Sequence, residues 1–447
     1  MKKVRAWLAL TVGLVGAGTV IACASSDEAS MDAGYGSSGI GGGTSSGASS
    51  ASSSGWGGAG GYIPPEEELE SSYGAPVATG NYVWITNPDS GRVAFIDATT
   101  LEIEVVDAGH GPTYLAGVPD AEDDVAVVLN VLSYDATVLR ASADGELTAT
   151  TLPVPAAGNR WAISQNGRWA TAWTDARDIE LADPIDGYQD MAVLDLEEDT
   201  STSLTVGYRP VALGYDDAGT SLFAVTEDGV SVVDLTGSAP TVIKNVPLSD
   251  DPFEDTASRD VAITPDGAFA LVRRDGEAAV TVVDLDDGTR IEVVLPAPVT
   301  DLDLSPDGTV AVAVVRDTSQ VALLPLPAIV SDPFTFPLVT VETVTIGSVA
   351  LAPESSVAFF YTNAIPSSAL TVFDSAAMTP VPKYISLHAA VKAVFPTPDA
   401  THAVVLHDTT SGGWPRLPCP RPAIARCSPQ AFWGIRNTPW WWPRCLR

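Results

Sequence analysis

The sequence predicts an all-β protein, a β-propeller of seven or eight four-stranded blades whose last blade is incomplete. Two observations lead to this prediction. Turn signals recur every 41 to 51 residues through the middle of the chain, and short runs rich in valine and alanine lie between them. No long helical periodicity competes with these runs in residues 80–408, so the repeat unit is built from strands.

The turn signal is clearest in two copies of one motif. Residues 260–267 (DVAITPDG) and 301–308 (DLDLSPDG) both end in Pro-Asp-Gly and lead into an apolar run. Such a tripeptide favours a tight turn between two strands. The proline-equivalent positions of seven copies, several of them degenerate, are 119, 165, 216, 265, 306, 353 and 398. This period suits a blade of four short antiparallel strands.

The second strand of each blade is the most apolar segment of the repeat. Residues 310–315 (VAVAVV), for example, are apolar on both faces, as expected for sheets that pack face to face. Second strands are predicted at 82–86, 125–129, 168–173, 221–225, 268–272, 309–315, 356–361 and 401–406. A ring of seven blades would need the two ends of the chain to share one blade, yet both ends supply a second strand. Either the ring therefore has eight blades or the chain is altered near its end.

The first repeat resembles a known family. Residues 82–87 (YVWITN), 91–100 (GRVAFIDATT) and 106–112 (VDAGHGP) are similar to the YVTN-type β-propeller repeat of the lactonase-like superfamily. The resemblance covers roughly 80–408 and implies the propeller fold. The chain departs from the family pattern at Trp84, where the family has threonine.

An aspartate recurs at the end of the predicted third strand. Its five copies are Asp97, Asp195, Asp234, Asp284 and Asp374. A carboxylate at this position accepts hydrogen bonds from the backbone of the following turn. Because a catalytic site breaks the symmetry of a repeat, these copies favour a structural role.

The N-terminus is typical of a secretory signal. Two lysines and an arginine precede the uncharged stretch 6–22, which ends in Val-Ile-Ala before Cys23. These last residues resemble the lipobox of bacterial lipoproteins, which implies cleavage before Cys23 and acylation of its thiol. In that family Ala24 favours the outer over the inner membrane, so we expect a lipid-anchored protein of the bacterial cell envelope. The alternative is an ordinary cleaved signal with a chance cysteine.

The chain divides into four parts. Residues 1–22 form the predicted signal peptide. Residues 23–79 contain the lipidated cysteine and a Gly/Ser-rich linker, which cannot bury enough apolar surface to fold. Residues 80–408 form the propeller, and 409–447 form an unusual tail with six arginines, no acid, five tryptophans and three cysteines. We interpret this tail as the product of a frameshift that leaves the final blade without its last two strands. The alternative is a disulfide-bearing or membrane-binding appendage.

The charge of the chain excludes some partners. The full sequence has a net charge of −33, and residues 62–408 hold 14 basic against 53 acidic side chains, a net of −39. A body this acidic repels nucleic acid and anionic lipid. We therefore expect a protein or glycan partner, no nucleic acid, and contact with the membrane only through the lipid anchor.

Basic residues are rare in the propeller, yet several fall in loops that join one blade to the next. The predicted ligand-binding residues are Arg160, Arg209, Arg259, His110 and Lys392, and His388 lies in an equivalent loop. Three arginines in successive blades predict a site for a planar anion such as a carboxylate, phosphate or sulfated sugar. The alternative is that each arginine pairs with a local acid such as Asp255 or Asp260.

Catalytic motifs are scarce. The four histidines lack metal spacing, so no catalytic residue and no metal ligand is predicted. Calcium is an alternative at two acidic segments, the long connection 174–190 and residues 250–255, although neither has EF-hand spacing. The sequence favours a non-enzymatic, membrane-tethered binding scaffold, and the alternative is a lactonase-like hydrolase.

Overall fold

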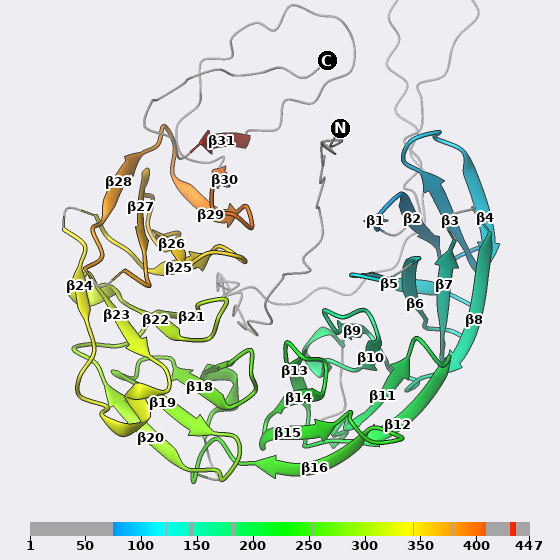
Figure 1. Cartoon of the computed structure of the whole chain (residues 1–447), viewed down its shortest axis with the longest axis horizontal. Helices are drawn as coiled ribbons and strands as arrows, with labels where there is room; N and C mark the ends of the chain where they lie inside the picture. Colours follow the sequence, from blue (N-terminus) through cyan, green and yellow to red (C-terminus); the bar gives the residue numbers. More distant parts are fainter. Residues whose placement is uncertain are drawn as a thin grey trace, which may run out of the picture. The chain divides into compact units, whose positions relative to one another are not determined.

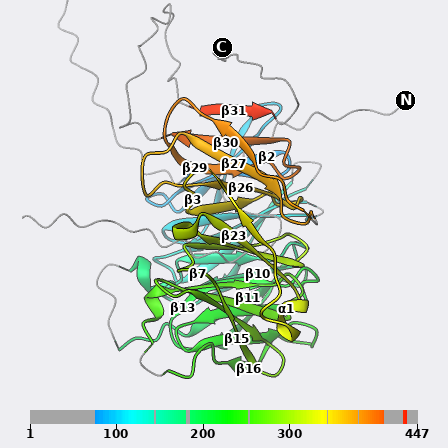
Figure 2. The ribbon, with the colours of Figure 1, turned by 90° about the vertical axis from the view of Figure 1, so that its left-hand side faces the viewer.

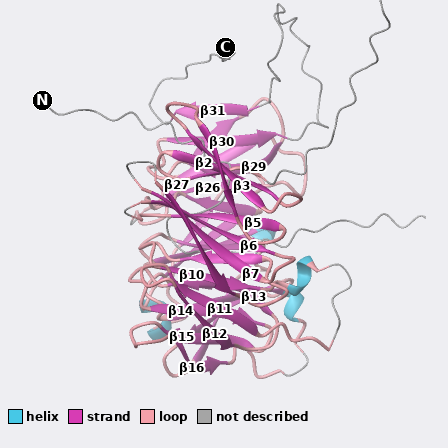
Figure 3. Cartoon of the chain, turned by 90° about the vertical axis from the view of Figure 1, so that its right-hand side faces the viewer, coloured by secondary structure: helices cyan, strands magenta, loops and turns pink. Residues whose placement is uncertain are grey.

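The computed structural model describes residues 75–407, apart from 122, 143–145, 180–184, 252–253, 343 and 378, together with the backbone of 430–434. The predicted signal peptide, Cys23 and most of the linker and tail lie outside these residues. Strands dominate the described part (Figure 3). Its helical segments are η1 (Ala176–Asp178), η2 (Thr256–Ser258), η3 (Arg316–Thr318) and α1 (Ala328–Ser331). Among the described helices, none has the length and apolar character needed to cross a bilayer.

The strands form eight antiparallel sheets, each a simple meander in chain order. Sheet 1 contains β1 (Val77–Ala78), β2 (Tyr82–Asn87), β3 (Arg92–Asp97) and β4 (Ile103–Asp107), and sheet 2 contains β5 (Pro112–Val118), β6 (Asp124–Asn130), β7 (Asp135–Ala141) and β8 (Leu147–Pro153). Sheet 3 contains β9 (Arg160–Ile163), β10 (Trp169–Trp173), β11 (Asp190–Asp195) and β12 (Thr200–Thr205). Sheet 4 contains β13 (Pro210–Tyr215), β14 (Ser221–Thr226), β15 (Gly229–Asp234) and β16 (Thr241–Val246).

Sheets 5 to 8 continue the series, and the last of them has three described strands. Sheet 5 contains β17 (Arg259–Ile263), β18 (Phe269–Arg274), β19 (Ala279–Asp284) and β20 (Arg290–Val294), and sheet 6 contains β21 (Asp301–Leu304), β22 (Val310–Val315), β23 (Gln320–Pro325) and β24 (Leu338–Thr340). Sheet 7 contains β25 (Ser348–Leu351), β26 (Val357–Tyr361), β27 (Ala369–Asp374) and β28 (Lys383–Ser386). Sheet 8 contains β29 (Val391–Pro396), β30 (His402–His407) and β31 (Gln430–Gly434).

Neighbouring sheets meet strand to strand in equivalent positions. First strands contact first strands, as β21 contacts β25, and fourth strands contact fourth strands, as β12 contacts β16. Figure 1 shows first strands such as β5, β9 and β21 on the inner side of the series and fourth strands such as β4, β8 and β20 on the outer side. This repeated arrangement of meandering sheets is that of a β-propeller, and it confirms the predicted fold class with eight sheets.

All eight predicted second strands are confirmed to within about two residues at each end. Their double-sided apolar character is explained by the core, which consists of seven apolar clusters, each between two consecutive sheets. In β22, Ala311 and Ala313 face sheet 5, whereas Val312 and Val314 face sheet 7. A strand alternates its side chains between two faces, so both residue sets must be apolar when both faces are covered.

The recurring aspartates have the predicted structural role. In all five copies Oδ1 accepts a hydrogen bond from the backbone N–H two residues later, at 2.6 Å in Asp97 and 2.8 Å in Asp234. These bonds hold the turn between the third and fourth strands. Hydrogen bonds from Thr100 and Thr236, respectively, are the main reason that the pKa values of Asp97 and Asp234 lie below the ordinary value for aspartate.

The two ends of the propeller differ in part from expectation. The first sheet begins at β1, slightly before residue 80, and Trp84, the departure from the family pattern, is fully buried and donates from Nε1 to Thr79 Oγ1 at 2.9 Å. At the other end the final sheet has three strands among the described residues, where the sequence analysis expected two. The third strand, β31, belongs to the predicted tail and pairs with β30 (Figure 2). The prediction that the final blade lacks its last two strands is therefore wrong for the third strand, which five residues of the tail supply.

Candidate functional site

The two ends of every sheet are built differently, which defines two faces of the propeller. We call the turn face the end where the first strand joins the second and the third joins the fourth. We call the connection face the opposite end, where the second strand joins the third and the fourth strand leads to the next sheet. All residues that the sequence predicts for ligand binding lie in or next to connection-face segments.

Two of the predicted arginines lie on the connection face with their side chains engaged. Arg160 begins β9, and its side chain is 51% exposed. Its guanidinium forms an ion pair with Asp178 of η1. Arg209 precedes β13 with a φ of +46°, and its Nε donates to the carbonyl of Asp186 at 3.1 Å. Its guanidinium also lies 5.4 Å from the ring centroid of Tyr208. Both arginines therefore brace the long connection between β10 and β11.

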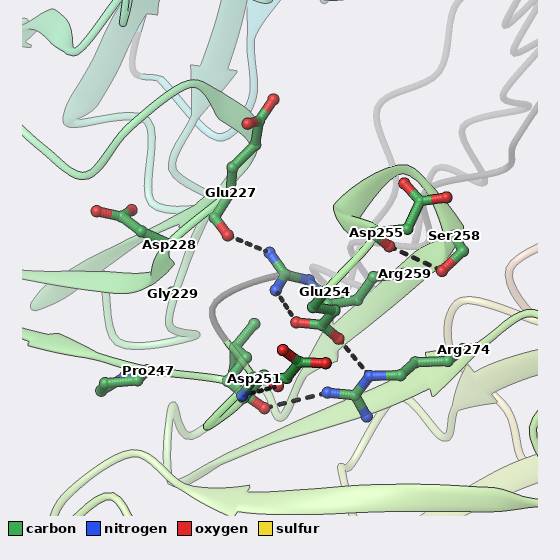
Figure 4. Close-up of polar contacts among 12 residues, drawn as sticks. Glu227, Asp228, Gly229, Pro247, Asp251, Glu254, Asp255, Ser258, Arg259 and Arg274 are labelled. Atoms are coloured by element: carbon green, nitrogen blue, oxygen red, sulfur yellow. Dashed lines mark hydrogen bonds and ion pairs between the residues drawn. The ribbon is translucent and has the colours of Figure 1, made fainter.

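The third arginine, Arg259, is a structural ion-pair partner. Its side chain is only 3% exposed and lies 3.0 Å from Glu254, whose other oxygen pairs with Arg274 (Figure 4). The same guanidinium donates to the carbonyl of Thr226 at 2.7 Å, which ties sheet 5 to sheet 4. Burial lowers the pKa of Arg259 from its ordinary value. The acid that pairs with Arg259 is thus Glu254, neither Asp255 nor Asp260.

The other predicted basic residues are exposed. His110 lies in the connection between sheets 1 and 2, where its backbone N–H donates to Ser133 Oγ at 2.9 Å. His388 precedes β29, and Lys392 lies within it. The three arginines belong to sheets 3 to 5, whereas His388 and Lys392 belong to the approach to sheet 8 and to sheet 8 itself.

A groove of about 520 Å³ lies at the connection face between sheets 4 and 5. Its walls come from residues 248–251 and 254–258, the end of β18 with the following turn, and strands β19 and β20. Arg274 and Arg290 are its basic residues, and both are ion-paired, with Glu254 and Asp250 respectively. The carboxylates that line it are Asp250, Asp251, Glu254, Asp255, Asp275, Glu277 and Glu292. The groove is therefore strongly acidic, with seven carboxylates against two guanidiniums.

This groove contains one of the two segments where the sequence offers calcium as an alternative. In the other segment, 174–190, the first two acids are engaged: Asp175 is buried and pairs with Arg177 at 2.7 Å, and Asp178 pairs with Arg160. Within the residues that the structure describes, no three histidine, cysteine, aspartate or glutamate side chains form a group that could hold a metal ion.

Two partly buried aspartates on β21 form a contact that the sequence analysis missed. Asp301 Oδ2 accepts from the Val349 N–H at 2.7 Å, and Asp303 Oδ2 accepts from the Leu351 N–H at 3.1 Å. Both donors belong to β25 of the next sheet, so the two carboxylates link sheet 6 to sheet 7. Each Oδ1 accepts from the next residue of its own strand, Leu302 at 3.0 Å and Leu304 at 2.9 Å.

Charged and polar groups from three sheets surround this pair. Burial is the main reason that the pKa of Asp303 rises to about 7, and it also raises the pKa values of Asp301 and Tyr361. Arg273 and Arg316 counteract the shift at Asp301. Arg273 in turn contacts Asp260 at 3.5 Å and Asp275 at 2.6 Å. Perturbed titratable groups gathered around the inner strands make this a candidate functional region.

The sequence contained a signal for this region. Residues 301–304 (DLDL) alternate acidic and apolar residues, which places both aspartates on one face of β21 and both leucines on the other. The leucines belong to the cluster between sheets 5 and 6. One face of β21 is thus buried, and the two acids on its other face indicate a neighbouring segment that offers polar partners. The structure identifies this segment as the backbone of β25.

Comparisons with known proteins yield fold likenesses only. No family model and no curated protein matches the sequence. Among solved structures, hydrazine synthase of Kuenenia stuttgartiensis is 17% identical, over 73% of this chain and 99% of that chain, with a TM-score of 0.36. Dihydro-heme d1 dehydrogenase NirN is 16% identical (71% and 66%, TM-score 0.42), and AztD of Citrobacter koseri is 13% identical (71% and 86%, TM-score 0.41). The described part of this chain is a β-propeller on the basis of its own eight sheets.

Proposed function

We propose that this chain is a lipid-anchored protein of the bacterial cell envelope, held at the outer membrane through Cys23, whose propeller binds a protein or a glycan without catalysing a reaction. The lipobox-like residues before Cys23 and the Gly/Ser-rich linker support the tethered arrangement. The eight-sheet scaffold supports the binding role, because rigid sheets hold the connecting loops in place as a recognition surface.

The groove between sheets 4 and 5 is the observation that carries the binding proposal. It has a volume of about 520 Å³, within the range of ligand sites, and Glu254 braces its wall between two arginines. A preformed wall loses little entropy when a ligand binds. Because carboxylates outnumber guanidiniums along it, the groove fits a partner that presents lysine or arginine side chains, and we favour a protein segment over a glycan.

Binding to basic and neutral probes tests this proposal. Surface plasmon resonance with an oligolysine peptide, an oligoglutamate peptide and a neutral oligosaccharide should show salt-dependent binding of oligolysine alone. The double variant Glu277→Gln/Glu292→Gln, which neutralises two exposed groove acids, should weaken that binding by about tenfold. The matched control Glu102→Gln/Glu104→Gln removes the same charge from the exposed β4 region of sheet 1 and should leave binding unchanged.

Two outcomes would contradict the groove assignment. Equal weakening by the groove and control variants would mean that oligolysine responds only to the overall charge. Binding of the oligosaccharide but not of oligolysine would make a glycan the partner instead.

The anchor has its own experiment. Cys23→Ala should give a protein that no longer incorporates labelled palmitate, because the thiol that carries the acyl chains is absent. Cys23→Ser is a second variant with the same expected result. Incorporation of labelled palmitate into either variant would refute acylation at Cys23.

A further inference from the structure

Three buried polar atoms without hydrogen-bond partners lie at the connection-face ends of three consecutive second strands. They are Arg273 Nε in β18, Arg316 Nε directly after β22, and Thr362 Oγ1 directly after β26. The Arg273 side chain is 8% exposed and Thr362 is 1% exposed. Because a buried donor without an acceptor is costly, three of them within two register positions of one another in sheets 5 to 7 require an explanation.

A chain of contacts connects these three positions. Arg273 Nη1 donates to the carbonyl of Val299 at 3.3 Å, and the neighbouring Thr300 Oγ1 donates to the carbonyl of Gly347 at 2.8 Å. Gly347 N–H donates to the carbonyl of Tyr361, the residue before Thr362, at 2.8 Å. The three orphaned groups therefore border one stretch of the connection face.

The Arg316 guanidinium lies directly against Gly347. A Cβ atom added at Gly347 would be 2.5 Å from Arg316 Nη2 and 2.8 Å from its Nε, so only glycine leaves room for this side chain. Within the described residues, the Arg316 side chain has no hydrogen bond or ion pair, unlike Arg160, Arg209 and Arg259. Its charge acts on the nearby Asp301, which is already bonded to backbone N–H groups of Leu302 and Val349.

The chemistry of the orphaned groups defines the ligand class. Both Nε atoms are donors and the threonine hydroxyl can donate, so the missing partner is an acceptor. A guanidinium fork matches the two oxygens of a planar carboxylate. Asp260, Asp301 and Asp303 lie in the same region, and a doubly charged anion such as phosphate would be repelled by them more strongly than a singly charged one.

We propose that the connection-face ends of sheets 5 to 7 form a binding site for a single carboxylate group, held by Arg273, Arg316 and Thr362. This site is separate from the acidic groove of the proposed function, which favours the opposite charge. The planar anion predicted from the sequence is therefore assigned to residues other than Arg160, Arg209 and Arg259, whose guanidiniums already contact acids or carbonyls.

Thermal unfolding of the full-length protein in detergent, titrated with sodium acetate and with sodium phosphate at constant ionic strength set by chloride, tests the proposal. Acetate should raise the melting temperature in a saturable manner, and phosphate should have a smaller effect. Arg316→Gln should weaken acetate binding by about tenfold or more, since a hydrogen bond to a charged group is lost. Arg316→Lys should restore little, because an ammonium lacks the bidentate fork.

Two further variants keep the test decisive. Gly347→Ala, whose added methyl group displaces the Arg316 side chain, should also reduce the response and serves if Arg316→Gln does not fold. Arg290→Gln removes a guanidinium of the groove and should leave the acetate response unchanged, which separates the two sites. The proposal is overturned if wild type shows no acetate-dependent shift, if Arg316→Gln and Gly347→Ala respond as wild type does, or if phosphate stabilises more than acetate.

Discussion

The turn face and the connection face of this propeller satisfy their polar groups in different ways. On the turn face, Asp97 and its four equivalents bond to backbone N–H groups two residues away, so each contact is local and repeats from sheet to sheet. On the connection face, contacts span longer stretches and do not repeat: Arg259 pairs with Thr226, and Asp301 pairs with Val349, 48 residues away. The contacts that repeat from sheet to sheet hold the scaffold together. The contacts that do not repeat give sheets 4 to 7 charged and polar groups that the other sheets do not share.

The largest effect is expected at a connection-face ion pair. Arg259→Ala should lower the free energy of unfolding by about 3–5 kcal/mol, because it removes one partner of a buried pair and leaves Glu254 with Arg274 alone. Arg160→Ala, which removes an exposed partner of Asp178, should cost less than about 1 kcal/mol. Urea denaturation of both variants measures the difference, and equal losses would show that burial does not separate these two arginines.

A glycine of the turn face should rank second. Gly267 has a φ of +70°, and an added Cβ would lie 2.3 Å from the Phe223 ring, so Gly267→Ala should cost about 2–4 kcal/mol through backbone strain and overpacking. Gly276 has a φ of +78° with open space around it, so Gly276→Ala isolates the strain at about 1 kcal/mol. Thermal or urea unfolding measures the loss of stability in each variant. If the two losses are equal, the close packing of Gly267 against Phe223 contributes nothing to the cost of Gly267→Ala.

The buried acids of the connection face should make stability depend on pH. The pKa of Asp303 in the folded protein, about 7, is above its ordinary value of 3.8, so the folded state binds this proton more tightly than the unfolded state does. Stability contributed by this group is therefore fully present below pH 3.8 and falls by up to about 1.4 kcal/mol per pH unit as the pH rises to about 7. Above pH 7 the contribution no longer changes.

The variant Asp303→Asn removes the titratable carboxyl group at this position and so tests its contribution to the pH dependence of stability. It should be less sensitive to pH between 4 and 7, and urea denaturation at several pH values in this window would show a stability difference from wild type that changes with pH. Asp301, whose pKa is also raised, lies close enough to raise the pKa of Asp303, so the difference between the two proteins reports the coupled pair of acids. Parallel pH profiles of wild type and variant would mean that Asp303 ionises normally in the fold.

The smallest effect is expected at a repeated aspartate of the turn face. Asp284→Ala removes the acceptor of two backbone hydrogen bonds, from Asp286 at 2.7 Å and Asp287 at 3.3 Å, and should cost about 1 kcal/mol. Asp286→Ala is the control, because the Asp286 side chain is 98% exposed and should contribute almost nothing beyond its contact with Lys244. Chemical denaturation that gave equal values for the two variants would contradict the structural role of the repeated aspartate.

The sequence by itself determined the features that depend on neighbouring residues. The second strands, the Pro-Asp-Gly turns such as 265–267 and the role of the third-strand aspartates were all predictable, because strand periodicity and turn hydrogen bonds involve residues a few positions apart. The number of sheets stayed open between seven and eight in the sequence, and the structure shows eight. Cys23 as the anchor and the frameshift origin of the tail stay predictions, because they lie outside what the structure describes.

Only the tertiary structure decided which distant residues meet. It paired Arg259 with Glu254 in place of Asp255 or Asp260, brought Asp301 and Asp303 to the backbone of β25, and joined β31 of the tail to β30. It also left the Arg316 guanidinium against Gly347 without an acceptor among the described residues. These outcomes depend on how one sheet packs on the next, and a pattern with a period of two along each strand carries no information about which side chain of the neighbouring sheet lies opposite.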